Sequence, residues 1–120
     1  MITTARFERR ARLLKAEEYS QVFNNAHRSR DQCFTVLAKP KIVGRAKLGL
    51  AVAKKKAKKA VSRNRFKRII RESFRLSQST IACADYVVMI QQNSEKFSNK
   101  QLFLSLEKHW QNLKKQCADS

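Results

Sequence analysis

Residues 58–76 limit the possible folds of this chain more than any other segment, because their pattern fits a helix with two opposed faces. One face has apolar or small side chains at i, i+3, i+4, i+7 and i+8: Phe66, Ile69, Ile70, Ser73 and Phe74. The opposite face has an amide and basic side chains: Asn64, Lys67, Arg68, Arg71 and Arg75. An apolar stripe of this kind packs one side of a helix on a core. The segment therefore predicts a long helix whose basic face is left for solvent or for a ligand.

Positive charge is concentrated around this helix. The 120 residues contain 27 Lys and Arg against 9 Asp and Glu, a formal net charge of +18. Residues 54–75 alone contain eleven of these cations and one acid, Glu72. Five lysines precede or open the helix, where the helix dipole disfavours cations: Lys54, Lys55, Lys56, Lys58 and Lys59. Phosphate groups would offset the repulsion, so the pattern favours nucleic acid as a partner, ahead of an anionic membrane surface.

Asn64 supports this interpretation. Asparagine is a poor residue for a helix interior, and this one lies between Arg63 and Arg65. An amide beside two guanidinium groups can hydrogen-bond base edges or sugar hydroxyls. A tolerated surface asparagine is the alternative.

The composition argues against a membrane-spanning, secreted or metal-binding protein. No run approaches the ~18–20 apolar residues of a membrane span, and the N-terminus has no apolar region typical of a secretory signal. Three cysteines without a C-x-x-C pair fit a reducing cytoplasm, and we expect Cys33 and Cys83 to be small buried side chains. His27 and His109 stand alone in the sequence, so neither a metal site nor a catalytic site is expected in the protein itself.

Hydrophobic periodicity divides the rest of the chain into helices and strands. Residues 1–12 are expected to be a basic, mobile arm, and residues 16–26 a helix. Residues 24–31 are expected to turn the chain, with a short strand at most. Residues 32–38 and 47–53 alternate as strands, and we expect them to form an antiparallel pair.

Two further elements complete the expected fold. Residues 86–91 resemble a buried strand, placed in the same sheet by a crossover through the basic helix. Ser98 and Gln101 have the spacing of a helix capping box. The helix they open would bury Leu102, Phe103, Leu106, Trp110 and Leu113. The order is that of one α+β domain over residues 1–120, with helices packed on a sheet.

The run from Ala60 to Arg75 resembles the signature helix of the bacterial ribonuclease P protein component. The motif is the Arg-Asn-Arg triplet at 63–65, followed by Lys67, Arg68 and Arg71. Residues 47–55 are similar to the strand before that helix, 12–23 to the family's opening helix, and 85–90 to its last strand. The resemblance thus covers nearly the whole chain in order. Tyr19 stands where the family often has phenylalanine.

This resemblance implies both a fold and a function. The family has a four-stranded sheet with a left-handed βαβ crossover, in the order α-β-β-β-α-β-α. Its protein is a subunit of a ribonucleoprotein endoribonuclease, which removes the 5′ leader from precursor tRNA by hydrolysis. The RNA subunit carries the catalytic site and the Mg²⁺ ions, so no catalytic residue is expected in the protein. The implied partners are that RNA and precursor tRNA, with no membrane and no protein partner required.

The resemblance also implies two sets of site residues. RNA contacts are expected at Lys54, Lys55, Arg63, Asn64, Arg65, Lys67, Arg68 and Arg71. A cleft for the leader, between the first helix and the sheet, would be lined by Tyr19, Phe23, Thr35 and Leu37. Aromatic faces accept unstacked bases of any sequence. The spacing of four between Tyr19 and Phe23 suits core packing equally well.

Other functions remain as alternatives. A structural RNA-binding protein, such as a small ribosomal protein, would have the same size, charge and α+β order. An autonomous nuclease is disfavoured because no pair of acid–base groups or carboxylates stands in the basic region. A DNA-binding helix-turn-helix is disfavoured because strands flank the basic helix.

Overall fold

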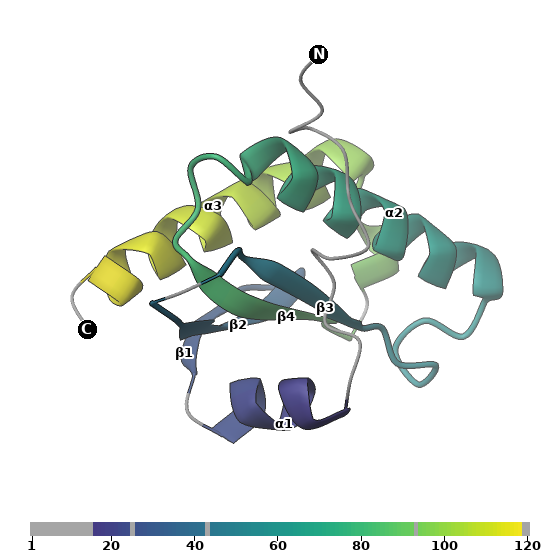
Figure 1. The fold of residues 1–120 in the computed structure, drawn as a ribbon. Helices are drawn as coiled ribbons and strands as arrows, with labels where there is room; N and C mark the ends of the chain where they lie inside the picture. The colour runs from purple at the N-terminus through teal and green to yellow at the C-terminus, as the bar shows by residue number, and fades with distance from the viewer. Residues whose placement is uncertain (1–15, 25, 43, 93, 119–120) are drawn as a thin grey trace, which may run out of the picture.

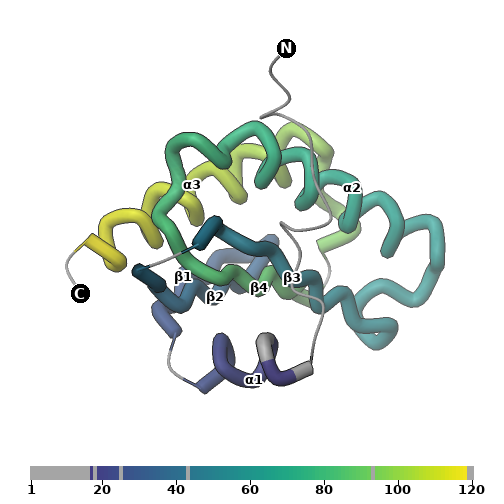
Figure 2. The backbone as a smooth tube through the Cα atoms, viewed as in Figure 1, coloured from purple at the N-terminus to yellow at the C-terminus, as the bar shows by residue number. Residues whose placement is uncertain are grey.

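The computed structural model describes residues 16–24, 26–42, 44–92 and 94–118 (Figures 1 and 2). In chain order the elements are α1 (Ala16–Asn24), β1 (His27–Arg30), β2 (Phe34–Pro40), β3 (Lys47–Ala51), α2 (Ala60–Ser77), β4 (Ala84–Ile90) and α3 (Asn99–Ala118). A single 3-10 turn, Ser94–Lys96, precedes α3. The expected α+β domain is confirmed, and the predicted short strand before residue 31 is present as β1. The basic arm expected at residues 1–12 lies outside the described residues.

The four strands form one mixed sheet in the order β1-β2-β4-β3. β4 pairs antiparallel with β2 and parallel with β3, and α2 makes the crossover between the two parallel strands. The predicted antiparallel pairing of β2 with β3 is therefore wrong, because β4 lies between them. β4 is apolar on both faces, with Tyr86, Val87 and Val88 all fully buried. Such a strand is stable at the centre of a sheet, where both of its edges are paired and both faces are covered.

Helices cover both faces of the sheet. Figure 1 shows α2 and α3 packed over one face and the short α1 on the other. The larger core lies under α2 and α3, and the buried residues of α2 are those predicted: Phe66, Ile69, Ile70, Ser73 and Phe74.

Three aromatic rings join the sheet to both helices of this layer. Phe74, Tyr86 and Trp110 meet edge to face, with ring centroids 5.4 to 5.9 Å apart. The indole N–H of Trp110 donates to Ser73 Oγ at 2.9 Å, and the Tyr86 hydroxyl donates to the Ala82 carbonyl at 2.7 Å. Each buried polar tip therefore has a partner, which removes the desolvation cost of burying it.

The start of α3 confirms the predicted capping box. The Gln101 N–H donates to Ser98 Oγ at 3.2 Å, and the Ser98 N–H donates to Gln101 Oε1 at 2.8 Å. These reciprocal bonds satisfy two backbone donors that a helix N-terminus otherwise leaves free. Leu102, Leu106, Trp110 and Leu113 of α3 are buried as expected, and Phe103 is partly buried.

The cysteines agree with the sequence only in part. Cys33 is buried, as predicted, whereas Cys83 is exposed and that prediction is wrong. Cys83 comes just before β4, at the end of the sheet, where its Sγ lies 3.2 Å from the Gly44 carbonyl oxygen. A small apolar side chain is buried only where a layer covers it, and the sequence did not show that this position lies at the sheet's end.

Candidate RNA interface

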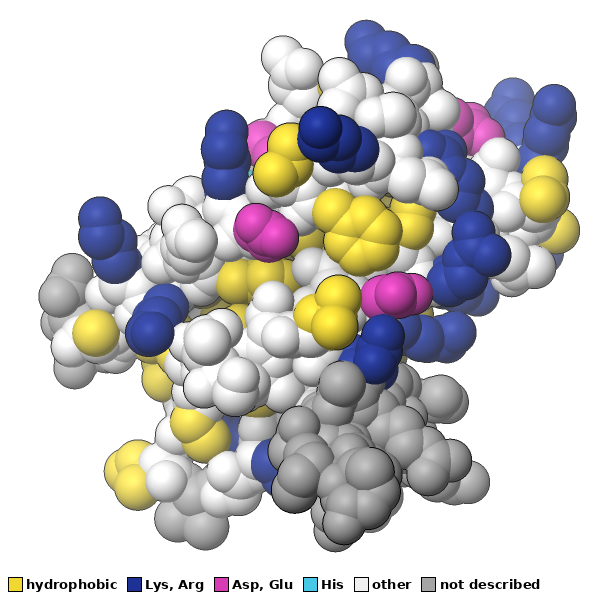
Figure 3. All heavy atoms as spheres, turned by 90° about the horizontal axis from the view of Figure 1, so that it is seen from above, with side chains coloured by type: hydrophobic (Ala, Val, Ile, Leu, Met, Phe, Trp, Pro, Cys, Tyr) yellow, Lys and Arg dark blue, Asp and Glu magenta, His cyan; other side chains and the backbone are white. Residues whose placement is uncertain are grey.

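The solvent-facing side of α2 combines an amide with cations. Asn64 and Arg68 are exposed, while Lys67, Arg71 and Arg75 are partly exposed, on the side of the helix away from its buried stripe. In Figure 3, Lys and Arg side chains are densest on the right, the side where the N-terminal half of α2 lies in Figure 1. The helix thus separates apolar and cationic faces as the sequence predicted.

A turn rich in lysine leads into α2. We call residues 54–59 the lysine turn: Lys54, Lys55, Lys58 and Lys59 are exposed, and Lys56 is partly buried. Ala57 in its middle is 0% exposed and belongs to the main core. The Ala57 methyl group therefore anchors the middle of the turn in the core, while four of its five lysine side chains are exposed.

The N-terminus of α2 has the electrostatics of an anion-binding site. Its N-cap residue, Lys59, makes no capping hydrogen bond through its side chain, and the first turn has no acidic residue. Free N–H groups and the positive end of the helix dipole therefore face the lysine turn. A phosphate group satisfies such donors and such a charge at once.

The two arginines of the Arg-Asn-Arg triplet bond to the chain itself. Arg63 Nη1 donates to the carbonyl oxygens of Ala57 at 2.9 Å and Lys58 at 2.7 Å. Arg65 ties α2 to the beginning of α3: its Nε donates to Asn99 Oδ1 at 2.8 Å and its Nη2 to the Phe97 carbonyl at 2.6 Å. These ties leave no sign in the sequence, because their acceptors are mostly backbone carbonyls.

The four residues expected to hold the leader lie on or beside the sheet face that α1 covers. Phe23 is 50% exposed, and Tyr19 is partly buried against a small cluster that contains Val22 and Leu37. Leu37 is 5% exposed, and Thr35 is 8% exposed with its Oγ1 accepting a hydrogen bond from Gln91 Nε2 at 2.6 Å. Phe23 therefore offers the most open ring, and the strand residues offer little free surface. The leader contacts stay a prediction.

An open groove of about 620 Å³ lies at the end of the sheet, beside the last residue of β1 and the residues that follow β4. Arg30, Gln92, Lys96 and Phe97 are among the residues that line it. Gln91, also in its lining, contacts Thr35 on the α1 side, while the Phe97 carbonyl receives the bond from Arg65 of α2. Two residues that line the groove thus contact Thr35 and Arg65, although no expected site residue lines the groove itself.

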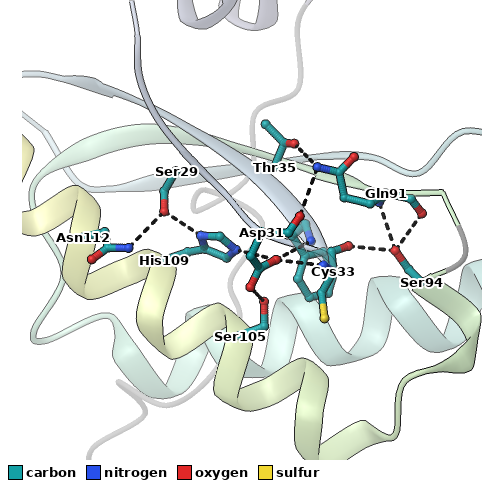
Figure 4. Close-up of polar contacts among 10 residues, drawn as sticks. Ser29, Asp31, Cys33, Thr35, Gln91, Ser94, Ser105, His109 and Asn112 are labelled. Carbon is teal, nitrogen blue, oxygen red and sulfur yellow. Dashed lines mark hydrogen bonds and ion pairs between the residues drawn. The ribbon is translucent and has the colours of Figure 1, made fainter.

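His109, which is isolated in the sequence, has polar neighbours in the fold. Figure 4 shows it between Ser29 and Asp31: its Nδ1 lies 2.6 Å from Ser29 Oγ, and its Nε2 lies 3.1 Å from Asp31 Oδ1. The second contact is at ion-pair distance but is not aligned as a hydrogen bond. Asp31 Oδ2 also accepts from the Ser105 hydroxyl at 2.6 Å. Serine, histidine and aspartate are here the residue types of a nucleophilic site.

Because its side chains are buried, this cluster has a structural role and not a catalytic one. Ser29 is 6% exposed and His109 is 2% exposed, so a phosphodiester bond has no access to either side chain. The sequence does contain a signal for this cluster. Polar side chains lie on one face of α3 at intervals of four, three and four residues: Ser105, His109, Asn112 and Gln116. Asn112 donates to Ser29 Oγ, and Gln116 donates to the Arg28 carbonyl. This polar stripe of α3 holds the edge strand β1.

The same contacts change the acidity of Asp31. Partial burial by itself raises the pKa of this carboxyl, because it disfavours the charged form. The Ser105 hydroxyl, the N–H groups of Phe34 and Cys33, and the nearby His109 together outweigh burial and lower the pKa below 3.8. The carboxylate is therefore ionised at neutral pH and is held by its neighbours.

Neither a metal site nor a membrane span is found in the part of the chain that the structure describes. There, no group of three or more His, Cys, Asp or Glu side chains is arranged to hold a metal ion. No helix among these residues is long and apolar enough to cross a membrane.

A mixed four-stranded sheet with a lysine- and arginine-rich crossover helix defines a class of small, basic, RNA-binding α+β proteins. A model of the Ribonuclease P family matches residues 7–114. The ribonuclease P protein component of Photobacterium profundum is 46% identical over 107 residues, covering 89% of this chain and 91% of that protein. That of Vibrio cholerae serotype O1 is 46% identical over 112 residues, covering 93% and 95%. The chain belongs to the ribonuclease P protein component family.

Solved structures agree with this assignment. The ribonuclease P protein of Staphylococcus aureus superimposes with a TM-score of 0.78 at 28% identity, covering 85% of this chain and 94% of that one. The Thermotoga maritima protein, at 24% identity and a TM-score of 0.74, shares the fold over 84% of this chain and 96% of its own. These likenesses support ribonuclease P over the small ribosomal protein that the sequence left as an alternative.

Proposed function

We propose that this chain is the protein subunit of a bacterial ribonuclease P, which binds the catalytic RNA and the 5′ leader of precursor tRNA. The observation that carries the proposal is the outward face of α2, where Asn64 and Arg68 are exposed opposite the buried stripe. Together with the lysine turn and the free helix N-terminus, this face gives a surface for a phosphate backbone. Base edges or 2′-hydroxyls would be read by Asn64.

The leader would be held on the other side of the sheet. Phe23 and Tyr19 are one helical turn apart, so both rings lie on one side of α1. Rings in this position support unpaired bases without selecting a sequence, which suits an enzyme that processes many tRNAs. The groove with Arg30 and Lys96 would guide the backbone between this surface and the RNA bound to α2.

In this proposal the RNA subunit carries the hydrolytic chemistry and holds the Mg²⁺ ions. Three described carboxylates already have partners: Asp31 accepts from Ser105 and neighbours His109, Asp85 is paired with Lys41 at 2.8 Å, and Glu72, on α2 itself, lies 3.5 Å from Arg75 Nη2. Each of these carboxylates therefore has a hydrogen-bonding or cationic neighbour within the protein. The protein's part is to bind and orient RNA, and its place is the cytoplasm, where precursor tRNA is processed.

Reconstituted cleavage tests this function. The purified, RNA-free protein should leave precursor tRNA intact at every Mg²⁺ concentration, and adding the cognate RNA subunit should give the mature 5′ end. The protein should also lower the Mg²⁺ needed by the RNA alone, because its cations screen phosphate repulsion. Metal-dependent cleavage by the protein without RNA would contradict the proposal. Co-purification with ribosomal RNA in place of one catalytic RNA would favour the structural alternative.

A further inference from the structure

Arg63 belongs to the motif expected to bind RNA, yet its guanidinium group faces its own chain. One nitrogen, Nη1, donates to two successive carbonyl oxygens, Ala57 at 2.9 Å and Lys58 at 2.7 Å. Both carbonyls belong to the lysine turn. A guanidinium nitrogen with two N–H groups suits this task, because it serves two acceptors without moving.

The other hydrogen bonds of the lysine turn join backbone groups, and two of them, from the N–H groups of Ser62 and Arg63 to the Lys59 carbonyl at 3.1 Å, belong to the first turn of α2. The N–H groups of Lys56 and Ala57 donate to the Ala53 carbonyl at 3.1 and 3.2 Å, and the Ala57 methyl is buried. Beyond Ala57 the chain reaches α2 through Lys58 and Lys59, whose side chains are exposed. Among the described contacts, Arg63 is the side chain that bonds the carbonyls of this stretch.

Repulsion between the lysines makes the hydrogen bonds from Arg63 important. Five ammonium groups within six residues repel one another, and the positive end of the α2 dipole adds to the repulsion. A sixth cation next to them is unfavourable unless it has acceptors of its own, and the two carbonyl oxygens supply them. The tie therefore keeps together a turn that its own charges would otherwise spread.

We infer that Arg63 is a positioning residue, which holds the lysine turn so that its ammonium groups converge on RNA at the N-terminus of α2. It acts on RNA through those lysines. Arg68 differs, because its side chain is exposed and has no hydrogen bond or ion pair within the described residues. The inference rests on the proposed function, since it assigns roles within the same interface.

A double-mutant cycle, in which affinity for the cognate RNA subunit is measured, tests this role. The full chain is compared with Arg63→Ala and Arg68→Ala, each in the native background and in one where Lys55, Lys58 and Lys59 are alanine. If Arg63 acts through the lysines, Arg63→Ala weakens binding by about tenfold in the native background and by less than about twofold without them. Arg68→Ala should give the same loss in both backgrounds. Equal losses for Arg63→Ala in both backgrounds would overturn the inference.

Limited trypsin digestion of the RNA-free protein gives a readout that does not depend on RNA. Arg63→Ala should be cut at Lys54–Lys59 several times faster than the native chain, whereas Arg68→Ala should be cut there at the native rate. Arg63→Met, which keeps the aliphatic stem but no donor, should behave like Arg63→Ala, so lost packing is not the cause. Unchanged cleavage in both Arg63 variants would disprove the tie. If the digestion results are as expected but no variant, nor the native chain, binds the RNA subunit, the proposed function is refuted instead.

Discussion

The Ser29 hydroxyl lies 2.6 Å from His109 Nδ1, joining the edge strand β1 to α3 across 80 residues of sequence. His109→Ala should therefore destabilise the fold by about 2–4 kcal/mol, because it opens a cavity and leaves Ser29 and Asp31 with fewer partners. Urea unfolding followed by Trp110 fluorescence measures this change. Lys108→Ala, the exposed neighbour on α3, is the control and should unfold like the native chain. Equal midpoints for both variants would show that the polar stripe adds no stability.

Acid should weaken the contacts that hold the Asp31 carboxylate. Its pKa is lowered in the folded state, so it stabilises the fold above its unfolded value near 3.8. That stability is lost as the pH falls through the lower, folded value. The free energy of unfolding should be measured from pH 5 downward. Below pH 3.8 it should fall less steeply for Asp31→Asn than for the native chain. The same slope in both proteins would mean that the carboxylate has no net favourable contacts.

The capping box should be measurable as a coupled pair. Ser98→Ala removes the acceptor for the Gln101 N–H and should cost about 1 kcal/mol of stability. Gln101→Ala removes the return bond, and the double variant should lose less than the sum of the two single losses. Denaturation of the four proteins gives this interaction free energy. Ser79→Ala, in an exposed position between α2 and β4, should have almost no effect.

Variants on the α1 side of the sheet should separate leader binding from stability. Phe23→Ala should lower affinity for precursor tRNA by about 1–3 kcal/mol and spare mature tRNA, because it removes a half-exposed ring on which a base can stack. Tyr19→Ala should act in the same direction. Leu37→Ala should instead cost about 2–5 kcal/mol of stability, because Leu37 is buried. If neither ring variant changes the ratio of precursor to mature affinity, the leader lies elsewhere.

Replacing Arg68 should weaken binding of the RNA subunit without affecting binding of the leader. Log affinity falls with log salt by roughly 0.7–0.9 per phosphate contact, so Arg68→Ala should reduce the slope by about one contact. The loss should be the same for substrates with and without a leader. Lys114→Ala removes an equal charge from an exposed position on α3 and serves as the control. Equal slopes for Arg68→Ala and the native chain would remove Arg68 from the interface.

Local patterns in the sequence predicted the parts of the fold that depend on near neighbours. The buried stripe of α2 from Phe66 to Phe74 follows from helical periodicity, and the Ser98–Gln101 box follows from spacing alone. Long-range pairings could not be read in this way. The alternation of β2 and β3 indicates strands, but it does not reveal that β4 separates them.

The same limit applies to the candidate site. The charge pattern located the basic face around Arg68, which is exposed as expected. It could not show that Arg63 and Arg65 bond to carbonyls, because backbone acceptors leave no mark in a sequence. His109 was missed for a related reason, since its partners Ser29 and Asp31 are ordinary polar residues far away in the chain.

The central position of β4 has a consequence for how the protein is made. β2 and β3 do not pair with each other. Both pair with β4, which begins only at Ala84, long after β3 ends at Ala51. Until residue 90 has emerged from the ribosome, the nascent chain can form the β1–β2 hairpin and α2, but the two halves of the sheet stay apart. Closing this loop costs chain entropy, and pairings between segments so far apart in the sequence slow folding. During that interval the cationic α2 segment is already synthesised, before the sheet that supports it is complete.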